Sequence, residues 1–403
     1  MNSHHTYDAD VIVVGGGLAG GLCVLALTEH APSLRVLLVE GNADLSGNHT
    51  WCCHKSDIEM VLETTAPSWF KRILSHQWTG YVVRFPNFDR QIDGEYFCIT
   101  SERLRAALVA NHAQNALDLA LGDPATSVQK ASVTLASGRA LSAPLVIDAR
   151  GMAGASFGTG TGFQKFLGWE IEVIDQPHPF GDCPLLMDAS VEQADGYRFV
   201  YTLPFSSHRL LVEDTYFSQN PRLDEEHIRV RLRHYLSSHG VSDFRIIREE
   251  RGVLPMPWRE RERAKDHDAV TIGYRGGFFH PATGYSLGQA VAVAEHIGQA
   301  SAGVQRDMIA PAVHNAVNTL RTELASDAAF ARKLNFLAFV AARARGLRGL
   351  VFSRVYQMSE SFLRRFYAAR LTRRDRLALL ARTARLPLFS SHEPQPLRRG
   401  EPA

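Results

Sequence analysis

The first forty residues alternate between apolar runs and a helical pattern in the order expected of a strand–helix–strand unit. Residues 9–14 form a short, β-branched apolar run, which is typical of a strand buried on both faces. A run of glycines follows, and residues 18–30 carry apolar side chains at helical period. A second apolar strand spans residues 35–39. The pattern therefore predicts that the chain opens with a βαβ unit.

Farther along, the period of the apolar positions changes several times. Residues 45–140 are mixed, whereas alternation at period two from 163 to 258 indicates an inserted, mostly antiparallel sheet. Residues 268–290 return to a strand and a helix, and residues 290–385 are helical throughout. The further elements expected are strands near 81–84, 96–99 and 144–148 and a helix near 102–113.

The composition is that of a folded protein of 403 residues, 45% apolar and 21% charged. A net charge of +2 argues against nucleic-acid binding, and five cysteines without a Cys-x-x-Cys pair indicate neither a disulfide framework nor a zinc ribbon. No His, Cys and carboxylate spacing suggests a metal site. The polar N-terminus does not resemble a secretory signal, and no apolar run is long enough to span a membrane. We therefore expect a cytoplasmic protein.

The glycine turn after the first strand has the spacing of a dinucleotide-binding site. Gly15, Gly17 and Gly20 would allow a tight turn, close approach of the backbone to a pyrophosphate, and close packing of helix on strand. The phosphates would lie at the helix N-terminus, which favours anions. Glu40 ends the second strand, 20 residues after Gly20, and would accept hydrogen bonds from an adenosine ribose. A purely structural glycine turn is the alternative.

Two later segments favour FAD over NAD. Residues 146–151, which include Asp148, look like the strand and turn that flavoproteins of the hydroxylase type place beside the ADP half. Residues 276–286 precede a helix, as does the segment that holds the flavin in that group, although a structural turn would have the same pattern. The candidate flavin contacts in it are Gly277, His280, Pro281, Gly284 and Tyr285. Because no second dinucleotide motif exists, NAD(P)H would act only as a transient reductant.

These assignments predict an α/β fold with a Rossmann-type FAD-binding domain of the flavin hydroxylase kind. That domain would be discontinuous, and an antiparallel-sheet substrate domain would be inserted in it. A helical C-terminal region would follow. The expected ranges are 1–160 and 260–305 for the FAD-binding domain, 161–259 for the substrate domain, 306–386 for a basic helical region and 387–403 for a loose tail.

Several further segments resemble one protein family. They are Asn48-His49-Thr50-Trp51, residues 196–204, residues 210–216, residues 250–256 and residues 280–286. Together they resemble the bacterial lycopene β-cyclases, and the resemblance runs from Val11 to about Arg376. The glycine motifs are shared by many flavoproteins, whereas Asn48-His49-Thr50-Trp51 and the segment around Glu213 are more specific.

The resemblance implies an isomerase that closes β-rings at the ψ ends of lycopene, giving γ-carotene and then β-carotene. A proton is added to the terminal double bond, the neighbouring alkene attacks the tertiary carbocation, and a proton is lost. The family uses reduced FAD without net oxidation, and the anionic flavin is thought to stabilise the cation electrostatically. Other ψ-end carotenoids are related candidate substrates.

Protonation of an alkene requires an acid beside it, and a carboxyl group in an apolar pocket is a plausible source. The family's acidic motif matches Glu213, so we take it as the acid. Side chains alternate across a strand, so Glu213 should share a face with Leu211 and Thr215, and Asp214 should point the other way in a supporting role. An exposed acidic pair at a strand edge is the alternative.

Aromatic side chains suit both a polyene and a carbocation. Tyr197, Phe199 and Tyr201 share one face of their expected strand, so they either line the pocket or belong to a plain core. His49 and Trp51 follow Glu40 closely and are candidates for contact with flavin or substrate, with packing as the alternative.

Lycopene resides in the bilayer, so we expect peripheral association with the membrane. Residues 332–385 carry 14 Lys and Arg against only Glu360 and Asp375, with apolar side chains interleaved. Such a basic amphipathic region suits an anionic membrane surface, and a solvated helical cap is the alternative. The sequence indicates no oligomeric state.

Two other classes of function fit the same flavoprotein pattern. A flavin monooxygenase or reductase acting on an apolar aromatic or prenyl substrate would share the fold and consume its reductant stoichiometrically. A carotenoid- or flavin-binding carrier would bind pigment without turnover. Fold analogy does not separate these from a cyclase. The segments 48–51 and 210–216 favour the cyclase.

Overall fold

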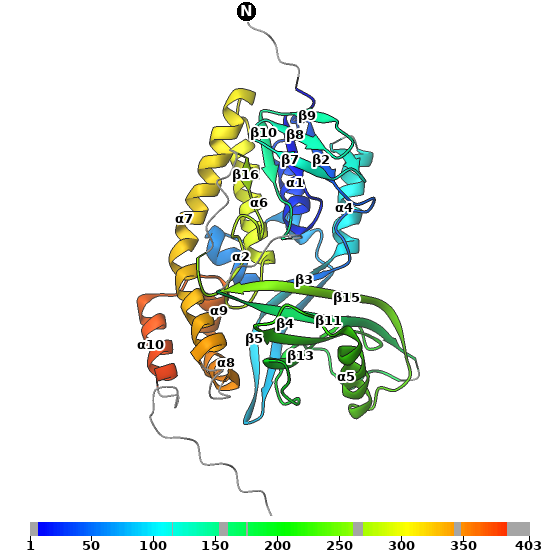
Figure 1. Cartoon of the computed structure of the whole chain (residues 1–403), viewed down its shortest axis with the longest axis vertical. Coiled ribbons are helices and arrows are strands. Elements are labelled where there is room, and N and C mark those ends of the chain that lie inside the picture. The colour runs from blue at the N-terminus through cyan, green and yellow to red at the C-terminus, as the bar shows by residue number, and fades with distance from the viewer. Residues whose placement is uncertain are drawn as a thin grey trace, which may run out of the picture.

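Two large sheets lie one after the other along the long axis of the protein, with helices packed against both, and a third, small sheet lies beside the upper one (Figure 1). The structure is a computed structural model. The structure describes residues 7–114, 116–152, 160–174, 176–260, 269–341 and 348–384. In Figure 1 the parallel sheet lies in the upper half and the larger, mostly antiparallel sheet in the lower half.

The upper sheet has five parallel strands in the order β16-β10-β1-β2-β6. Its strands are β1 (Val11–Val14), β2 (Val36–Glu40), β6 (Asp118–Leu121), β10 (Leu145–Asp148) and β16 (Val270–Thr271). The helices beside it are α1 (Leu18–His30), α4 (Ser101–Ala113) and α6 (Leu287–Ser301). The predicted βαβ opening is confirmed.

Both faces of this sheet are covered, which explains its continuous apolar strands. Val11 and Val13 point into a core shared with α1 and α6, whereas Ile12 and Val14 face a small three-stranded sheet. That small sheet is formed by β7 (Ala125–Val128), β8 (Ser132–Leu135) and β9 (Ala140–Ser142).

The lower sheet has eight strands in the order β15-β11-β14-β13-β12-β4-β5-β3, and only the β12–β4 pairing is parallel among its described pairs. From the range expected to form a sheet come β11 (Thr161–Val173), β12 (Leu185–Asp188), β13 (Tyr197–Pro204), β14 (Arg209–Ser218) and β15 (Phe244–Pro257). The other three are β3 (Thr50–His54), β4 (His76–Phe85) and β5 (Phe88–Thr100).

These last three strands differ from the sequence expectation, which left them in the mixed part of the FAD-binding domain. The chain leaves β2, adds β5, β4 and β3 to the far side of the lower sheet, and returns to the upper half through α4. Pairing between strands so distant in sequence leaves no mark on the local pattern. The inserted sheet is therefore built from two separate segments of the chain.

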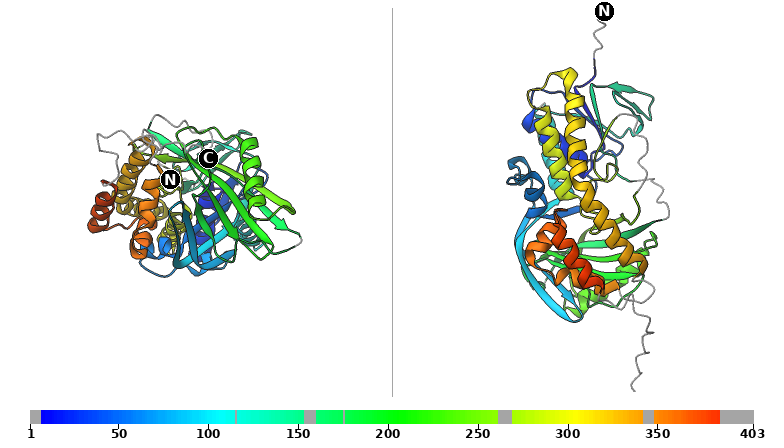
Figure 2. Two further views of the ribbon diagram at one scale, coloured as in Figure 1. Left: turned by 90° about the horizontal axis from the view of Figure 1, so that it is seen from below. Right: turned by 90° about the vertical axis from the view of Figure 1, so that its left-hand side faces the viewer.

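Helices cover the two faces of the lower sheet unequally. One face carries α5 (Glu225–Ser238), whose Ile228 and Leu232 pack on Trp169 and Val212. The other face carries the lower part of α7 and the C-terminal helices, as the side view in Figure 2 shows. The remaining helical elements are α2 (Lys55–Leu62), α3 (Ser68–Lys71), η1 (Arg306–Met308), α7 (Ile309–Phe336), η2 (Leu337–Ala341), α8 (Arg348–Tyr356), α9 (Glu360–Tyr367) and α10 (Arg373–Ala384). The predicted tail 387–403 lies outside the described residues.

Candidate active site

One continuous cavity connects the carboxyl ends of the parallel strands with the lower sheet. Its volume is about 1090 Å³, slightly above the range of roughly 300–1,000 Å³ for small-molecule sites. Its upper part is lined by Val14, Gly15, Gly17, Glu40, Asn42, Ala149, Arg150 and Tyr274. Its lower part is lined by Thr50, Gln164, Phe166, Phe199, Tyr201, Glu213, Phe217, Leu254, Phe352 and Leu379. One cavity therefore borders both the glycine turn and Glu213.

The glycine turn meets the steric demands predicted from its spacing. Gly15 has φ +107°, and a Cβ at Gly20 would lie 1.9 Å from the carbonyl oxygen of Gly15. Gly17 lines the cavity, and a Cβ there would meet nothing within 4 Å, so this position is open toward a ligand. The Glu40 carboxylate accepts a hydrogen bond from the backbone N–H of Gly16 at 2.7 Å. Glu40, at the end of β2, is therefore hydrogen-bonded directly to the glycine turn.

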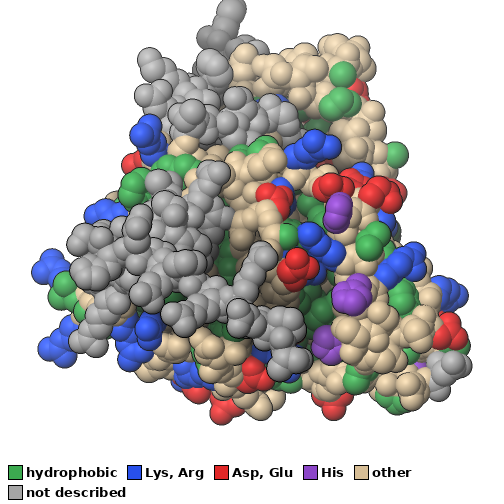
Figure 3. Space-filling model, turned by 60° about the horizontal axis from the view of Figure 1, so that its bottom comes forward, with side chains coloured by type: hydrophobic (Ala, Val, Ile, Leu, Met, Phe, Trp, Pro, Cys, Tyr) green, Lys and Arg blue, Asp and Glu red, His purple; other side chains and the backbone are tan. Residues whose placement is uncertain are grey.

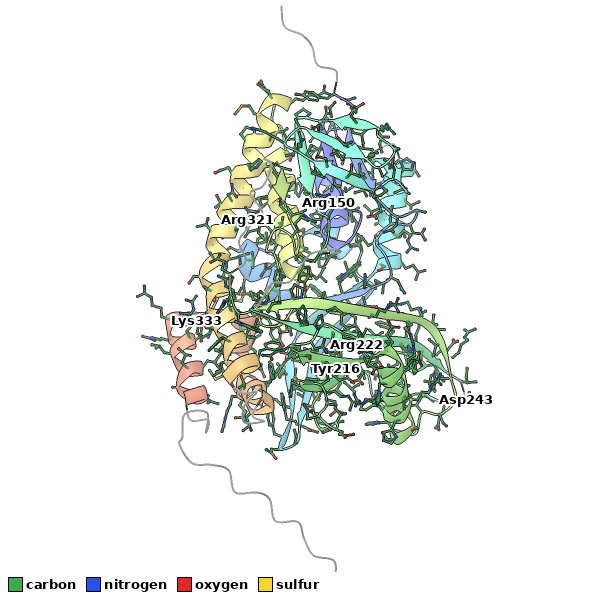
Figure 4. All side chains as sticks on the ribbon, viewed as in Figure 1. Arg150, Tyr216, Arg222, Asp243, Arg321 and Lys333 are labelled. Atoms are coloured by element: carbon green, nitrogen blue, oxygen red, sulfur yellow. The ribbon has the colours of Figure 1, made fainter. Side chains whose placement is uncertain are left out.

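The guanidinium of Arg150 separates Asp148 from the cavity. Asp148 does not line the cavity, but its carboxylate pairs with the guanidinium of Arg150 at 2.7 Å, and Arg150 lines the upper part. The Arg150 label in Figure 4 marks this position in the upper half of the molecule. In this segment Arg150 therefore faces the cavity, and Asp148 fixes the position of its guanidinium.

The second glycine-rich segment divides into residues that line the cavity and residues that do not. Gly284 and Tyr285 line it, whereas Gly277, His280 and Pro281 do not. His280 is buried and packs edge-on against Phe366 at 5.0 Å between ring centroids, and burial lowers its pKa to about 4. His280 therefore packs on a C-terminal helix and does not line the cavity, so its contact with a flavin stays a prediction.

The two adjacent carboxyl groups point to opposite faces of β14, as strand alternation predicted. Glu213 lines the cavity. Asp214 accepts hydrogen bonds from Nε of Arg198 at 2.7 Å and from the hydroxyl of Tyr216 at 2.8 Å on the face toward α5. Tyr216 is labelled on the lower sheet in Figure 4. Burial raises the pKa of Asp214, and its contact with Arg198 opposes that rise.

Glu213 is a buried acid with few polar partners. Thr215 donates a hydrogen bond to its carboxyl oxygen at 2.5 Å. Burial, and next the like charge of Glu250, raise the pKa of Glu213 to about 8. At neutral pH the folded protein therefore holds a proton on this carboxyl group, facing an apolar and aromatic cavity.

The aromatic residues predicted on β13 fall into two environments. Phe199 and Tyr201 line the cavity, as do His49 and Trp51 on the β3 side. Tyr197 does not line it, because its ring stacks on Phe352 at 4.5 Å between centroids. Pocket lining is thus found for four of these five residues.

Three tyrosines form a hydroxyl chain across the cavity wall. The hydroxyl of Tyr96 lies 3.1 Å from that of Tyr201 and 2.9 Å from that of Tyr285. Burial raises the pKa values of all three hydroxyls, so they remain neutral donors and acceptors. The chain joins the β13 wall to the second glycine-rich segment.

The sequence interpretation missed Phe166 and Phe217, which line the cavity on β11 and β14. Both lie on the same face as Glu213, since Phe166 pairs with Thr215 and Phe217 lies four residues after Glu213 on β14. Period-two counting from Glu213 would have found Phe217. Phe166 required the register between the two strands.

Comparisons with known proteins identify the family of this chain. A match to the family described as "Lycopene cyclase protein" covers residues 10–393. The chain belongs to the lycopene cyclase family. It is 37% identical over 392 residues to a lycopene β-cyclase of Pantoea ananas, covering 95% of this chain and 96% of that protein. A lycopene β-cyclase of a Paracoccus strain is 36% identical over 388 residues, covering 94% of this chain and 95% of that protein.

Solved structures share the fold of this lycopene cyclase family member at low sequence identity. One is a geranylgeranyl bacteriochlorophyll reductase-like protein from Thermoplasma acidophilum, with a TM-score of 0.59 and 14% identity, covering 93% of this chain and 96% of that one. Another is PqsL of Pseudomonas aeruginosa, a probable FAD-dependent monooxygenase, with a TM-score of 0.57 and 15% identity, covering 86% and 99% of the two chains. The predicted fold class is confirmed.

Proposed function

We propose that this protein is a lycopene β-cyclase that converts the ψ ends of lycopene to β-rings, through γ-carotene to β-carotene. The observation that carries the proposal is the buried carboxyl group of Glu213, whose pKa burial raises to about 8, in the wall of an apolar, aromatic cavity that is also lined by a nucleotide-type glycine turn. Relatives 36–38% identical over nearly the whole chain carry the name of this activity.

In the proposed mechanism Glu213 donates its proton to the terminal double bond of the substrate. The resulting tertiary carbocation is attacked by the neighbouring alkene, a ring closes, and a proton is lost from the ring. Atoms and electrons balance without a redox change. The aromatic faces of Phe199, Phe217 and Tyr201 enclose the reacting end, keep water away from the cation and present their negative faces to it.

Reduced FAD is the proposed cofactor. The open position at Gly17, the turn at Gly15 and the cation of Arg150 suit the phosphates, and Glu40 suits the ribose. Gly284 and Tyr285 line the cavity where the flavin end would lie. Bound there, reduced FAD would supply negative charge beside the cationic centre. NAD(P)H would serve only to reduce it.

Peripheral membrane association is also proposed, but fewer apolar side chains are exposed for it than the sequence suggested. Most apolar side chains of the basic C-terminal region are buried against the lower sheet, among them Phe339, Val351 and Phe362. Leu377 and Leu380 on α10 are exposed, at 66% and 45%. None of the helices within the described ranges has both the length and the hydropathy needed to cross a bilayer.

The exposed leucines of α10 lie next to basic side chains. Arg373 and Arg374 at the start of this helix are exposed as well, and Leu379 on its inner side lines the cavity. Figure 3 shows Lys and Arg side chains along the left-hand edge of the lower face, which is the α10 side of the molecule. A helix that touches both the bilayer and the cavity would give a bilayer substrate a short path inward.

The proposal is tested with purified protein, lycopene in liposomes and FAD under anaerobic, reducing conditions, with products separated by HPLC. Wild type should form β-carotene without proportional consumption of reductant, and Glu213→Gln should form none. Glu172→Gln removes a carboxylate from the exposed rim of the same sheet, where it pairs with Arg245, and should retain activity. Oxygenated or saturated products would indicate a monooxygenase or reductase. Unchanged lycopene in every reaction would indicate a carrier.

A further inference from the structure

A second buried carboxyl group lies on the same face of the lower sheet as Glu213. In the register of β14, β11 and β15, Gly168 of the central strand is paired with Glu213 on one side and with Glu250 on the other. Paired positions on neighbouring strands direct their side chains to the same face. Glu213 and Glu250 are therefore neighbours across a glycine.

Gly168 leaves no side chain between the two carboxyl groups. A Cβ at this position would lie 3.2 Å from Cβ and 3.3 Å from Cγ of Glu213, so Glu213 leans over the glycine. Both carboxyl groups are buried, with Glu213 at 8% and Glu250 at 3% exposure. Water therefore screens their interaction poorly.

The partners of the two groups differ. Glu250 accepts hydrogen bonds from Nη1 of Arg248 at 2.6 Å and from the hydroxyl of Thr50 at 3.0 Å. Among the residues that the structure describes, the hydrogen bond to the Glu213 carboxyl group comes from the hydroxyl of Thr215 alone. When two carboxyl groups share a buried site, the better-paired one ionises and the other keeps its proton. Burial raises the pKa of Glu250 as well, but the charge of Arg248 and the hydrogen bonds from Arg248 and Thr50 oppose that rise. The pairing therefore makes Glu250 the group of the two that ionises first.

The other charged groups on this face of the sheet do not change which of the two carboxyl groups is ionised. Arg248 is paired one step farther along the sheet, opposite Glu170, whose carboxylate it also contacts at 2.6 Å. Arg209 binds the same Glu170 from the edge of β14. The pKa of His49, on the β3 side, is lowered by burial and by the positive charge of Arg248.

On the remaining sides the groups near Glu213 are neutral or face away. Tyr201 is the residue paired with Glu213 on β13, and burial raises the pKa of its hydroxyl. Asp214 and Arg198 form their pair on the opposite face of the sheet. Glu250 is therefore the charge that stands next to Glu213 across Gly168.

We propose that Glu250 is a positioning residue whose carboxylate, fixed by Arg248 and Thr50, adds to the effect of burial in keeping the proton on Glu213 at neutral pH. This rests on the proposed role of Glu213 as the proton donor. A general acid is most effective when its pKa lies near the working pH, because it then carries its proton and still gives it up readily. Glu250 adjusts the pKa of Glu213 through its negative charge on the other side of Gly168, and it does not touch the substrate.

The test is the pH dependence of anaerobic β-carotene formation in Glu250→Gln. Without the like charge Glu213 loses its proton more readily, so the alkaline limb of kcat should move to lower pH by about 1 unit. Activity at the acid end should stay within a few-fold of wild type, and KM should be unchanged. Glu250→Asp keeps the charge and should restore the wild-type position of the limb. Glu172→Gln should leave the profile unchanged.

A second readout does not depend on turnover. The carbonyl band of a protonated carboxyl group that disappears in Glu213→Gln can be titrated by infrared difference spectroscopy in the FAD-loaded protein. In Glu250→Gln its midpoint should lie about 1 pH unit below that of wild type. Coincident midpoints, or a loss of kcat that is equal at every pH, would overturn the role of Glu250. A wild-type protein inactive at every pH, with the infrared shift present, would overturn the cyclase proposal alone.

Discussion

Replacing Glu213 by Gln should make the protein more stable than wild type at alkaline pH and leave the two alike at acid pH. The glutamine keeps the size and the hydrogen-bonding capacity of a protonated carboxyl group toward Thr215. It cannot ionise. The difference between the two proteins therefore isolates the free energy of placing a carboxylate in the cavity wall.

The magnitude follows from the displaced titration. Burial and the like charge of Glu250 raise the pKa of Glu213 from 4.5 to about 8 in the folded protein. Between these values the folded state holds a proton that the unfolded state has released, so stability falls as pH rises. At about 1.4 kcal/mol per pH unit, the full difference is roughly 4–5 kcal/mol, reached above pH 8.

The assay is the thermal unfolding midpoint of both proteins with excess FAD, measured at intervals from about pH 5 to pH 9. The stability difference should open between about pH 5 and pH 8 and then become constant. Glu172→Gln, which removes an exposed carboxylate, should show no such trend. A difference between wild type and Glu213→Gln that stays constant across the range would refute the reasoning, because Glu213 would then be ionised throughout or exposed.

Three further predictions concern the cofactor turn and the membrane. Gly20→Ala places a Cβ 1.9 Å from a backbone oxygen. It should lower the free energy of unfolding by more than the roughly 1–3 kcal/mol that ordinary overpacking costs. Gly17→Ala should fold normally but retain less FAD, as the ratio of flavin to protein absorbance would show; equal FAD content in Gly17→Ala and wild type would contradict this. The double variant Leu377→Asp/Leu380→Asp should co-sediment less with anionic vesicles, whereas Val230→Asp, at 65% exposure on α5, should behave as wild type. Equal loss in both would show that any added charge weakens binding.

Local patterns in the sequence were sufficient to predict the glycine turn that lines the upper part of the cavity. The strand, glycine turn and helix that hold Gly15, Gly17 and Gly20 are consecutive in the chain, so spacing alone places them together. The opposite orientations of Glu213 and Asp214 follow from alternation within one strand. Each of these features depends on residues close in sequence.

The rest of the site depends on pairing between distant strands. Glu250 belonged to a segment that the sequence singled out, but only the register of β15 and β14 on either side of β11 brings it beside Glu213. Gly168 carried no signal in the sequence, since its role is the absence of a side chain between two others. The basic C-terminal region shows a similar limit, because period alone does not reveal whether Phe339 or Phe362 faces the sheet or the solvent.

The central claim is that ring closure starts with a proton from Glu213 and involves no net redox change. The most direct measurement runs the anaerobic liposome reaction in D₂O and determines the deuterium content of β-carotene by mass spectrometry, together with the reductant consumed. The account predicts one deuterium per ring, no proportional loss of reductant, and neither product nor label with Glu213→Gln. Unlabelled β-carotene, or reductant consumed one-for-one with product, would contradict it.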